Sequence, residues 1–427
     1  MPVTLPKRPI VKDIYKSFLS YLMAHKDDPL SRDVVFNVPY QLLRCENSVS
    51  ALREKGAFFS GDKLVDFLLE DVPMVKTGIY DPAAGCGDLL LRYLDKLELA
   101  SSFNDSMHEW ESIVFAAEQE PSFVKLMKLR LWLLLYLKYH GGTKLGKLVI
   151  PDLRERFAGV VCRDAFKYLP ETMPAIVIMN PPFQQVDSNG AYSWGTGKVS
   201  YAAIFLYEMY KRFPASRIVA VLPDVLRSGS RYEKLRTTVA TDLKNGVRVY
   251  GRFDKKTDVD VFVLDHRPDM RKRVLINVER RQGRMICNDF DVHVGAVVPH
   301  RDALRGRSCF FLTADNVPPG SNIIRVKEKI KSVHKSVKGP FVVLRRTSSP
   351  SDTIRCVSSI VSSSHEFHLD NHLIYLKPKV HKSALKLCQD VCNFFSSQEC
   401  SAIVNSLIRC RHLTVRIIRD LTYKGDN

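Results

Sequence analysis

The chain has 427 residues, of which 45% are hydrophobic and 26% are charged, and its formal net charge is +18. This length fits two domains, each large enough to bury its own core, and the composition is that of an ordinary soluble protein. The longest apolar run, Leu131 to Leu137, is far shorter than the roughly 20 residues of a membrane-spanning helix, so no membrane partner is expected.

The ten cysteines of the chain occur without a single CxxC pair. This spacing predicts neither a zinc site nor a disulfide framework. We therefore expect reduced thiols in a cytoplasmic protein, and no bound metal.

The positive charge is concentrated in the C-terminal third. From Asp265 onward there are 28 basic and 15 acidic residues, a net charge of +13, whereas the first 264 residues carry a net charge of +5. A basic segment beside a nearly neutral one is typical of contact with a polyanion such as a nucleic acid. A basic, solvated surface without such a partner is the alternative.

Along the chain, residues 1–50 are expected to form a helical N-terminal extension. From Gly78 onward, strand-like apolar runs alternate with helical stretches, which is the pattern of a doubly wound α/β sheet. The expected strands are residues 78–80, 114–117, 160–162, 176–179, 218–222, 247–250 and 259–264, and the expected helices are residues 89–97, 123–139, 201–213 and 232–243.

The last two expected strands are joined by a short link, so the sheet should end in an antiparallel hairpin. After about Pro268, short strands and turns rich in Ser, Pro and Gly replace the alternation, as in residues 317–320 and 348–351. We therefore predict a first domain over residues 1–268 and a second, basic, mainly β or mixed domain over residues 269–427.

Two short segments, each following an expected buried strand, carry the chemistry. They are Asp81-Pro82-Ala83-Ala84-Gly85-Cys86-Gly87-Asp88-Leu89 and Asn180-Pro181-Pro182-Phe183. In an open parallel sheet, ligands bind at the carboxyl ends of the strands. Glycines beside a carboxylate suit a nucleotide-like cofactor, and a dinucleotide would also fit such a loop. An amide, two prolines and an aromatic ring suit a planar, nitrogen-bearing substrate.

Together the two segments resemble the amino-methyltransferases that use S-adenosylmethionine, and most closely the gamma-group (TaqI-type) adenine-N6 DNA methyltransferases. The resemblance covers roughly residues 56–380. It implies a Rossmann-like class I methyltransferase sheet, S-adenosylmethionine as cofactor, a target-recognition domain at the C-terminal end, and double-stranded DNA as partner in a prokaryotic cell or phage-infected host. No nuclease segment is evident, which implies a methyltransferase that acts alone or beside a separate restriction endonuclease.

Three acidic residues after three successive expected strands would hold the cofactor, according to this resemblance. Asp81 would take the amino group of the methionine moiety, Glu118 would accept hydrogen bonds from both ribose hydroxyls, and Asp164 would accept one from the adenine amino group. For each acid alone, a helix N-cap or a surface carboxylate is an equally good interpretation. Their order after three strands favours the cofactor site.

The remaining cofactor contacts come from small residues and one aromatic ring. Gly85 and Gly87 would let the backbone approach the ligand where a Cβ would intrude, and Ala83, just before them, would be a further contact. Ser60 would cover the methionine end, although the family prefers Thr-Pro where this chain has Ser-Gly. Phe166 would stack on the cofactor, one position after the aromatic residue of many relatives.

The second segment would methylate an exocyclic amine, whose lone pair is delocalised into the ring. The Asn180 side-chain oxygen and the Pro181 carbonyl would each accept one N–H and bring the nitrogen toward tetrahedral geometry. The prolines stiffen the loop, so that positioning supplies most of the rate, and Phe183 would stack on the base. No general base is needed beforehand, because the amine becomes acidic only once it is methylated.

The resemblance also assigns contacts to DNA. Phe253, in the expected terminal hairpin, would sandwich the target base with Phe183 after the base has rotated out of the duplex. Phosphates would be bound by basic residues of the second domain. These are Arg271, Lys272 and Arg273, with Lys327, Lys329, Lys331, Arg345 and Arg346 as further candidates.

Other functions fit parts of the same pattern. Asn-Pro-Pro-aromatic segments also occur in enzymes that methylate guanine in RNA or a glutamine amide in a protein, but these lack a large basic domain after the hairpin. A non-catalytic DNA-binding relative is a further alternative. The intact cofactor and catalytic segments argue against it, because a binding module has no use for them.

Overall fold

The computed structural model describes residues 13–47, 62–239, 246–253, 259–268, 283–302, 304–320, 326–380 and 382–424. The chain divides into two compact units. The first comprises Met1–Leu226 and Arg231–Val274, and the second comprises Arg227–Ser230 and Leu275–Asn427.

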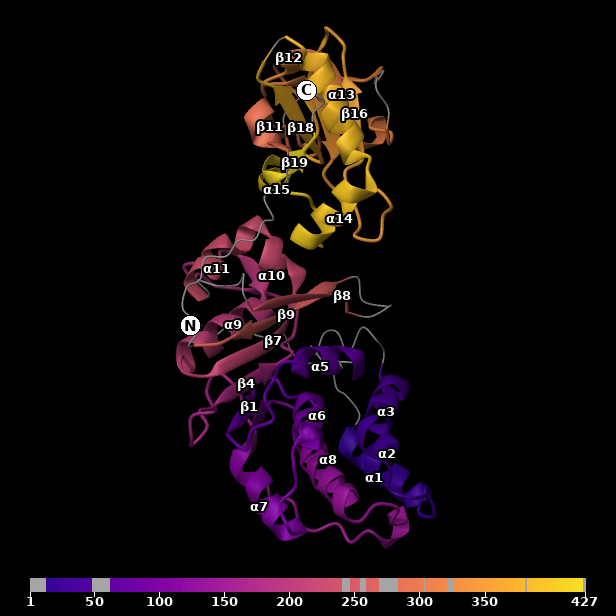
Figure 1. The fold of residues 1–427 in the computed structure, drawn as a ribbon, viewed down its shortest axis with the longest axis vertical. Helices are drawn as coiled ribbons and strands as arrows, with labels where there is room; N and C mark the ends of the chain where they lie inside the picture. The colour runs from indigo at the N-terminus through magenta and orange to yellow at the C-terminus, as the bar shows by residue number, and fades with distance from the viewer. Residues whose placement is uncertain are drawn as a thin grey trace. The chain divides into compact units, whose positions relative to one another are not determined.

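The first unit is built on a seven-stranded sheet in the order β3-β2-β1-β4-β7-β9-β8 (Figure 1). Strands β3, β2, β1, β4 and β7 are parallel, and β9 is antiparallel to both of its neighbours. This arrangement confirms the predicted α/β fold with an antiparallel terminal hairpin. The strands are β1 (Ile79–Asp81), β2 (Val114–Glu118), β3 (Val160–Cys162), β4 (Ile176–Met179), β7 (Arg217–Pro223), β8 (Val247–Arg252) and β9 (Asp260–His266).

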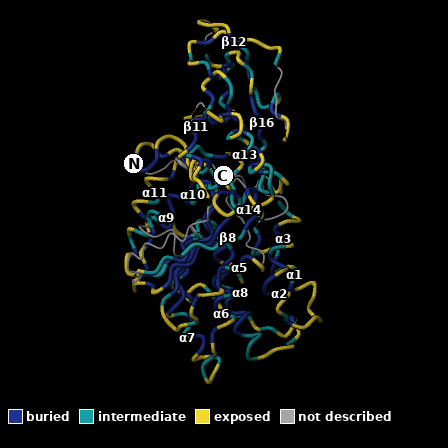
Figure 2. The backbone as a smooth tube through the Cα atoms, turned by 45° about the horizontal axis from the view of Figure 1, so that its top comes forward, coloured by how far each residue is buried: buried dark blue, intermediate teal, exposed yellow. Residues whose placement is uncertain are grey.

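Alternating residues of the inner strands enter two separate cores, because successive side chains of a strand point to opposite faces. Ile79 and Ile176 pack in one core with helices α1, α5, α6, α7 and α8, whereas Tyr80 and Val177 pack in the other with α9 and α11. Strands β1 and β4 are therefore buried throughout (Figure 2).

The helices of the first unit cover both faces of this sheet. In the N-terminal extension, α1, α2 and α3 agree with the predicted helical character. The segment before β2, where no helix was predicted, forms α7. The helices are α1 (Ile14–Ala24), α2 (Arg32–Phe36), α3 (Val38–Glu46), α5 (Asp62–Leu69), α6 (Asp88–Lys96), α7 (Phe103–Ile113), α8 (Pro121–Tyr139), α9 (Tyr201–Arg212), α10 (Asp224–Ser228) and α11 (Glu233–Val239).

The second unit contains two four-stranded sheets, β11-β18-β15-β16 and β13-β12-β17-β14, and a small pair, β10-β19. Strand β15 contributes Val342 and Leu344 to a core with the C-terminal helices, and Phe341 and Val343 to a core with the other sheet. The predicted mainly β or mixed character is thus confirmed. The strands are β10 (Arg284–Met285), β11 (Phe290–Val294), β12 (Arg307–Leu312), β13 (Lys329–Ser332), β14 (Val337–Lys338), β15 (Phe341–Arg345), β16 (Ser358–Val361), β17 (Glu366–Leu369), β18 (Leu373–Pro378) and β19 (Thr422–Tyr423). The helices are α12 (Ile286–Asp289), α13 (Ala384–Phe395), α14 (Gln398–Leu407) and α15 (Val415–Asp420).

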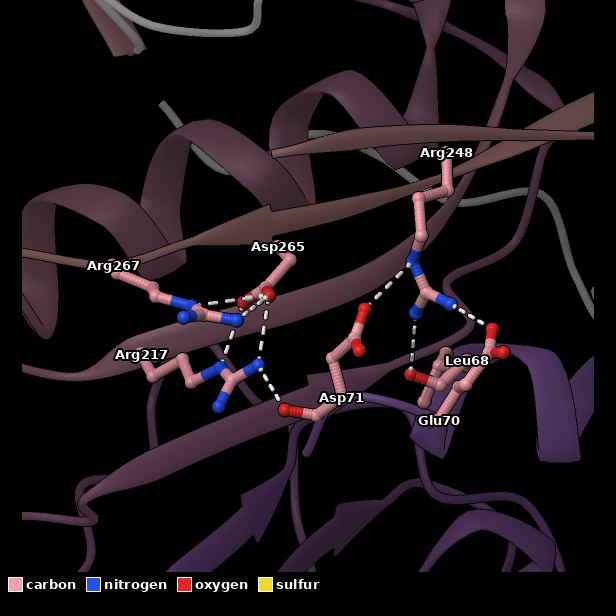
Figure 3. Close-up of polar contacts among 7 residues, drawn as sticks. All are labelled: Leu68, Glu70, Asp71, Arg217, Arg248, Asp265 and Arg267. Atoms are coloured by element: carbon pink, nitrogen blue, oxygen red, sulfur yellow. Dashed lines mark hydrogen bonds and ion pairs between the residues drawn. The ribbon is translucent and has the colours of Figure 1, made fainter. Parts of the chain in front are cut away.

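A charged network fastens the end of α5 to the terminal strands of the first unit (Figure 3). Arg217 of β7 forms an ion pair of 2.7 Å with Asp265 of β9 and donates to the backbone carbonyl of Asp71, also at 2.7 Å. Arg248 of β8 bonds Glu70 at 2.6 Å and lies 3.5 Å from the Asp71 carboxylate. Helix α5 is therefore held by strands that follow it in sequence by about 150 residues or more.

Asp265 is the buried anion at the centre of this network. Burial alone would raise its pKa, but hydrogen bonds from Arg217 and Arg267 outweigh that effect and hold the pKa below its usual value. Asp265 therefore stabilises the fold fully above about pH 4, and this contribution is lost as the pH falls through its folded-state pKa.

We expect Asp265→Asn to lower the free energy of unfolding at pH 7 by about 3 kcal/mol, since two arginines lose their buried partner. The loss should shrink as the pH falls below about 4, because the carboxyl of the unfolded chain then takes up a proton, whereas the folded protein keeps it ionised until its lower folded-state pKa is passed. Urea denaturation at pH 7 and pH 3.5 measures both effects. Asp71→Asn is the matched control, because an exposed pair contributes less than about 1 kcal/mol. Equal losses in the two variants would contradict the central role of Asp265.

Candidate functional site

Four loops that carry predicted site residues lie at one edge of the sheet. Strands β3, β2, β1 and β4 are consecutive and parallel, with Tyr80 opposite Phe115 and Val177, and Ala117 opposite Val161. Their carboxyl ends therefore meet at the same edge. Asp81 and Glu118 end β1 and β2, and Asp164 and Asn180 follow β3 and β4.

The glycines of the loop after β1 serve two different purposes. Gly85 has φ +54°, and a Cβ built on it would meet nothing within 4 Å, so the space above it is open. Gly87 has φ +88° and precedes α6, and a Cβ there would lie 2.6 Å from Cγ of Met127 on α8. Gly85 fits the prediction of close approach by a ligand. The space beside Gly87 is taken by the protein itself.

Asp81 is buried, with 1% of its surface exposed. Its Oδ1 accepts a hydrogen bond from the Ala83 amide at 3.0 Å, which shapes the turn. Burial raises the pKa of the carboxyl to about 8; the Ala83 bond lowers it, and the nearby Glu118 and Asp88 raise it. Asp81 is therefore a buried acid whose ionised form a cationic ligand group, such as the predicted amino group of a methionine moiety, would stabilise.

Glu118 ties the end of β2 to the loop after β1. One carboxylate oxygen accepts from the Gly85 amide at 3.1 Å, and the other accepts from the amides of Gln119 and Glu120 at 2.6 and 2.9 Å. A second link joins the same elements, since the Ala84 amide donates to the Ala117 carbonyl at 3.3 Å. The carboxylate predicted to meet the ribose thus also orders the glycine turn.

The loop after β3 is held by an arginine that the sequence analysis did not identify. Arg212 of α9 donates to the carbonyls of Ala165 and Tyr168, both at 2.6 Å. Asp164 accepts from the Phe166 amide at 3.0 Å, closing a local turn. The Phe166 ring lies 4.8 Å from that of Phe205, so it packs on α9 at the edge of the loop.

The segment after β4 leads into a hairpin that was not predicted. Asn180 is 9% exposed and Pro181 is buried, and Phe183 is half-buried. Strands β5 (Gln185–Asp187) and β6 (Lys198–Ser200) then pair, and the Tyr201 amide closes the base of the hairpin on the Gln184 carbonyl at 2.8 Å. The Asn-Gly pair between the two strands, at residues 189–190, is the signal that could have indicated a turn.

Aromatic rings fasten this hairpin to the helices behind it. Trp194 is 3% exposed, and its ring lies 5.1 Å from that of Tyr192 and 5.9 Å from that of Tyr207 on α9. The Tyr232 hydroxyl accepts a hydrogen bond from the Ser200 amide at 2.8 Å. The segment that contains Asn180 is therefore anchored by β4 at one end and by this cluster at the other.

The rings of Phe183 and Phe253, which were predicted to sandwich the target base, are in direct contact with each other. Their centroids are 5.5 Å apart and their planes make an angle of 83°. This is an edge-to-face aromatic pair, which leaves no gap for a base between two parallel rings. A base could stack between them only after the rings had separated.

A cavity of about 400 Å³ lies beside Phe253. It is bounded by the C-terminal end of α2, by α3, by the N-terminal parts of α5 and α6, and by β8. The N-terminal helices thus contribute to it, which sequence reasoning did not anticipate. Its lining residues are Phe36, Asn37, Tyr40, Asp62, Lys63, Leu64, Val65, Asp88, Arg92, Tyr250 and Phe253.

Ser60, Arg271, Lys272 and Arg273 lie outside the described residues. Within the part of the chain that the structure describes, no cluster of three or more His, Cys, Asp or Glu side chains could hold a metal ion. In the same part of the chain, no helix is both long and apolar enough to cross a membrane.

Neither the family models nor the curated proteins contain a match to this chain. Among solved structures, it is similar to the type IIL restriction-modification enzyme MmeI, solved in complex with DNA, with 12% identity, a TM-score of 0.50, and coverage of 90% of this chain and 70% of MmeI. The type IIG restriction endonuclease BpuSI is 13% identical with a TM-score of 0.39, and 92% of this chain covers 60% of it. The M protein of the type I restriction enzyme EcoKI is 17% identical with a TM-score of 0.30, over 60% of this chain and 54% of that one. The likeness to MmeI concerns the fold alone, which is that of the predicted class I methyltransferase sheet with an additional β-rich unit.

The raised pKa of Asp81 makes a testable contribution to stability. Since its folded-state pKa of about 8 lies above the ordinary value, the folded protein binds one more proton than the unfolded chain between about pH 4 and 8. The free energy of unfolding therefore falls as pH rises through this window, by up to about 1.4 kcal/mol per pH unit from this group.

We expect Asp81→Asn to remove that slope, because an amide stays neutral and still accepts from Ala83. Urea denaturation at pH 5.5, 6.5 and 7.5 compares the two proteins. Parallel pH curves for wild type and variant would show that Asp81 is ionised in the folded state.

Proposed function

We propose that this chain is an S-adenosylmethionine-dependent DNA methyltransferase that methylates adenine N6, in a restriction-modification or related DNA-modification role. The observation that carries the proposal is the adjacency of β1 and β4, in which Ile79 lies opposite Ile176. It brings the glycine loop and the Asn180 segment side by side at the carboxyl edge, as transfer between a bound cofactor and a substrate amine requires.

The residues after β1 and β2 suit the proposed cofactor. The open space above Gly85 admits a ligand close to the backbone, and the buried Asp81 suits a cationic amino group. Glu118 already orders the turn, and a carboxylate offers about four acceptor sites in total, so ribose hydroxyls can share it. When bound, S-adenosylmethionine supplies an electrophilic methyl group. The chain's own residues orient it and exclude water.

The Asn180 segment would act on the amine by position rather than by proton abstraction. The side-chain oxygen of Asn180 and the carbonyl of Pro181 accept the two N–H groups and direct the nitrogen lone pair toward the methyl donor. Because the segment is anchored at both ends, this geometry costs little to maintain during reaction. Phe183, once separated from Phe253, stacks on the base.

Double-stranded DNA is the proposed partner, and the second unit its main binding surface. The concentration of positive charge after residue 264 supports this, as does the fold shared with MmeI, which was solved with DNA. A base within a duplex cannot reach the edge of a sheet, so the target must rotate out of the stack.

Removing the amide of Asn180 should abolish methyl transfer and leave cofactor binding intact. We expect Asn180→Ala to lower kcat by at least about 100-fold, as loss of one preorganised polar group does, with the dissociation constant of S-adenosylmethionine unchanged. Gln185→Ala, which removes an exposed amide at the start of β5, is the matched control and should keep full activity. Nucleoside analysis of the product should give N6-methyldeoxyadenosine. N4-methylcytosine, or label confined to RNA or protein, would refute the substrate assignment.

Strand β13 carries exposed lysines on which the proposed DNA-binding surface can be tested. Lys329 and Lys331 are exposed and alternate along the strand, so they point to the same side, with Lys329 4.8 Å from the centroid of the Phe310 ring. Lys327 is exposed two residues earlier. Arg345 and Arg346, by contrast, donate to the carbonyls of Val317 and Asn371 and have a local structural role.

We expect the double variant Lys329→Ala/Lys331→Ala to weaken binding to all duplexes alike. Each lost phosphate contact should reduce the slope of log K against log salt by about 0.9. The control is Lys382→Ala/Lys386→Ala, at helix α13. This helix packs on one face of the sheet that contains β15, and the sheet that contains β13 packs on the other face. Fluorescence anisotropy between 50 and 200 mM salt, about the range over which such contacts are lost, measures the slopes. Equal slopes in both double variants would contradict a DNA surface at β13.

A further inference from the structure

A fully buried arginine connects the loop after β1 to the N-terminal helices. Arg130 of α8 is 1% exposed. Its Nε donates to the Val35 carbonyl at 2.8 Å, and its terminal nitrogens donate to the carbonyls of Cys86 at 2.6 Å and Phe36 at 3.4 Å. The same guanidinium forms an ion pair of 2.8 Å with Asp88, the first residue of α6.

These acceptors are chemically suited to a cation. Val35 and Phe36 end α2, and the carbonyls of a last helical turn have no partner within the helix and attract positive charge. A guanidinium has five donors in a rigid plane, so one side chain can bond all four groups at once. Lysine, a compact ammonium on a flexible stem, cannot span them.

The cavity beside Phe253 has its walls on the two elements that Arg130 joins. Phe36, Asn37 and Tyr40 of the N-terminal helices form one wall, and Asp88 and Arg92 of α6 form another. The Arg92 guanidinium also lies 4.2 Å from the centroid of the Phe36 ring. The separation of the two walls therefore depends on the bonds made by Arg130.

We propose that Arg130 is a positioning residue for the cofactor: it fixes the Cys86 carbonyl and the start of α6 against the end of α2, and so makes the N-terminal helices part of the binding site. The inference rests on the proposed function, because it takes S-adenosylmethionine as the ligand of the loop after β1. Arg130 itself touches neither the cofactor nor the substrate.

The test compares cofactor binding in Arg130→Lys with that in Arg355→Lys. Arg355, in the second unit, is also fully buried and donates to main-chain carbonyls, those of Ser348, Ile408 and Cys410. Both variants should lose thermal stability. Only Arg130→Lys should raise the dissociation constant of S-adenosylmethionine, by at least about tenfold, whereas kcat at saturating cofactor should stay within about threefold of the wild-type value.

Calorimetry well below the melting temperatures distinguishes the outcomes. Wild-type protein that does not bind S-adenosylmethionine would refute the proposed function before any variant is compared. Binding by wild type together with an unchanged dissociation constant in Arg130→Lys would overturn the positioning role and leave the proposed function intact.

A second measurement needs no variant and covers the case in which Arg130→Lys does not fold. Addition of S-adenosylmethionine should slow hydrogen exchange of the wild-type protein at the amides of the loop after β1. It should also slow exchange at residues 35–37, which the Arg130 guanidinium joins to that loop. Protection of the loop alone, with unchanged exchange at residues 35–37, would overturn the inference.

Discussion

Ionised side chains that bond to main-chain atoms hold the loops at the carboxyl edge of the sheet. A parallel sheet orders its strands, but the loops beyond the strand ends have no ladder of their own. Here Glu118 holds the Gly85 amide, Arg130 the Cys86 carbonyl, and Arg212 the carbonyls of Ala165 and Tyr168. Each is a charge-assisted hydrogen bond, stronger and more directional than a neutral one. The arrangement of the candidate site depends on these few contacts.

The strands of the seven-stranded sheet could be predicted because most of them are short apolar runs, and the edge at which the site lies follows from the parallel order of the inner ones. Other elements lacked such a signal. Helix α7, which was not predicted, mixes polar and apolar residues. The β5–β6 hairpin has strands of only three residues each, so their alternation is brief.

For the candidate site, residue types were more predictable than their surroundings. Asp81, Glu118 and Asn180 are recognisable by their place after strands, but the burial of Asp81 and the three amides bound by Glu118 depend on tertiary packing. Arg130 illustrates the limit best. It lies in a long helix with apolar residues on all sides, and apart from the Asp88 carboxylate the partners described above are backbone atoms 44 and about 95 residues away. Backbone acceptors leave no mark in the sequence.

Strand β8 leads directly to Phe253, whose ring contacts that of Phe183. Among the described strands, β8 pairs with β9 alone, and their register shifts between Val249 and Gly251, where Gly251 has φ +103°. Phe253 directly follows this irregular strand. A strand with one neighbour can bend at such a bulge without breaking a ladder on its other side. Because a bulge bends and twists the strand that carries it, this irregularity helps to set the direction in which the chain reaches Phe253, and with it the placement of that ring against Phe183.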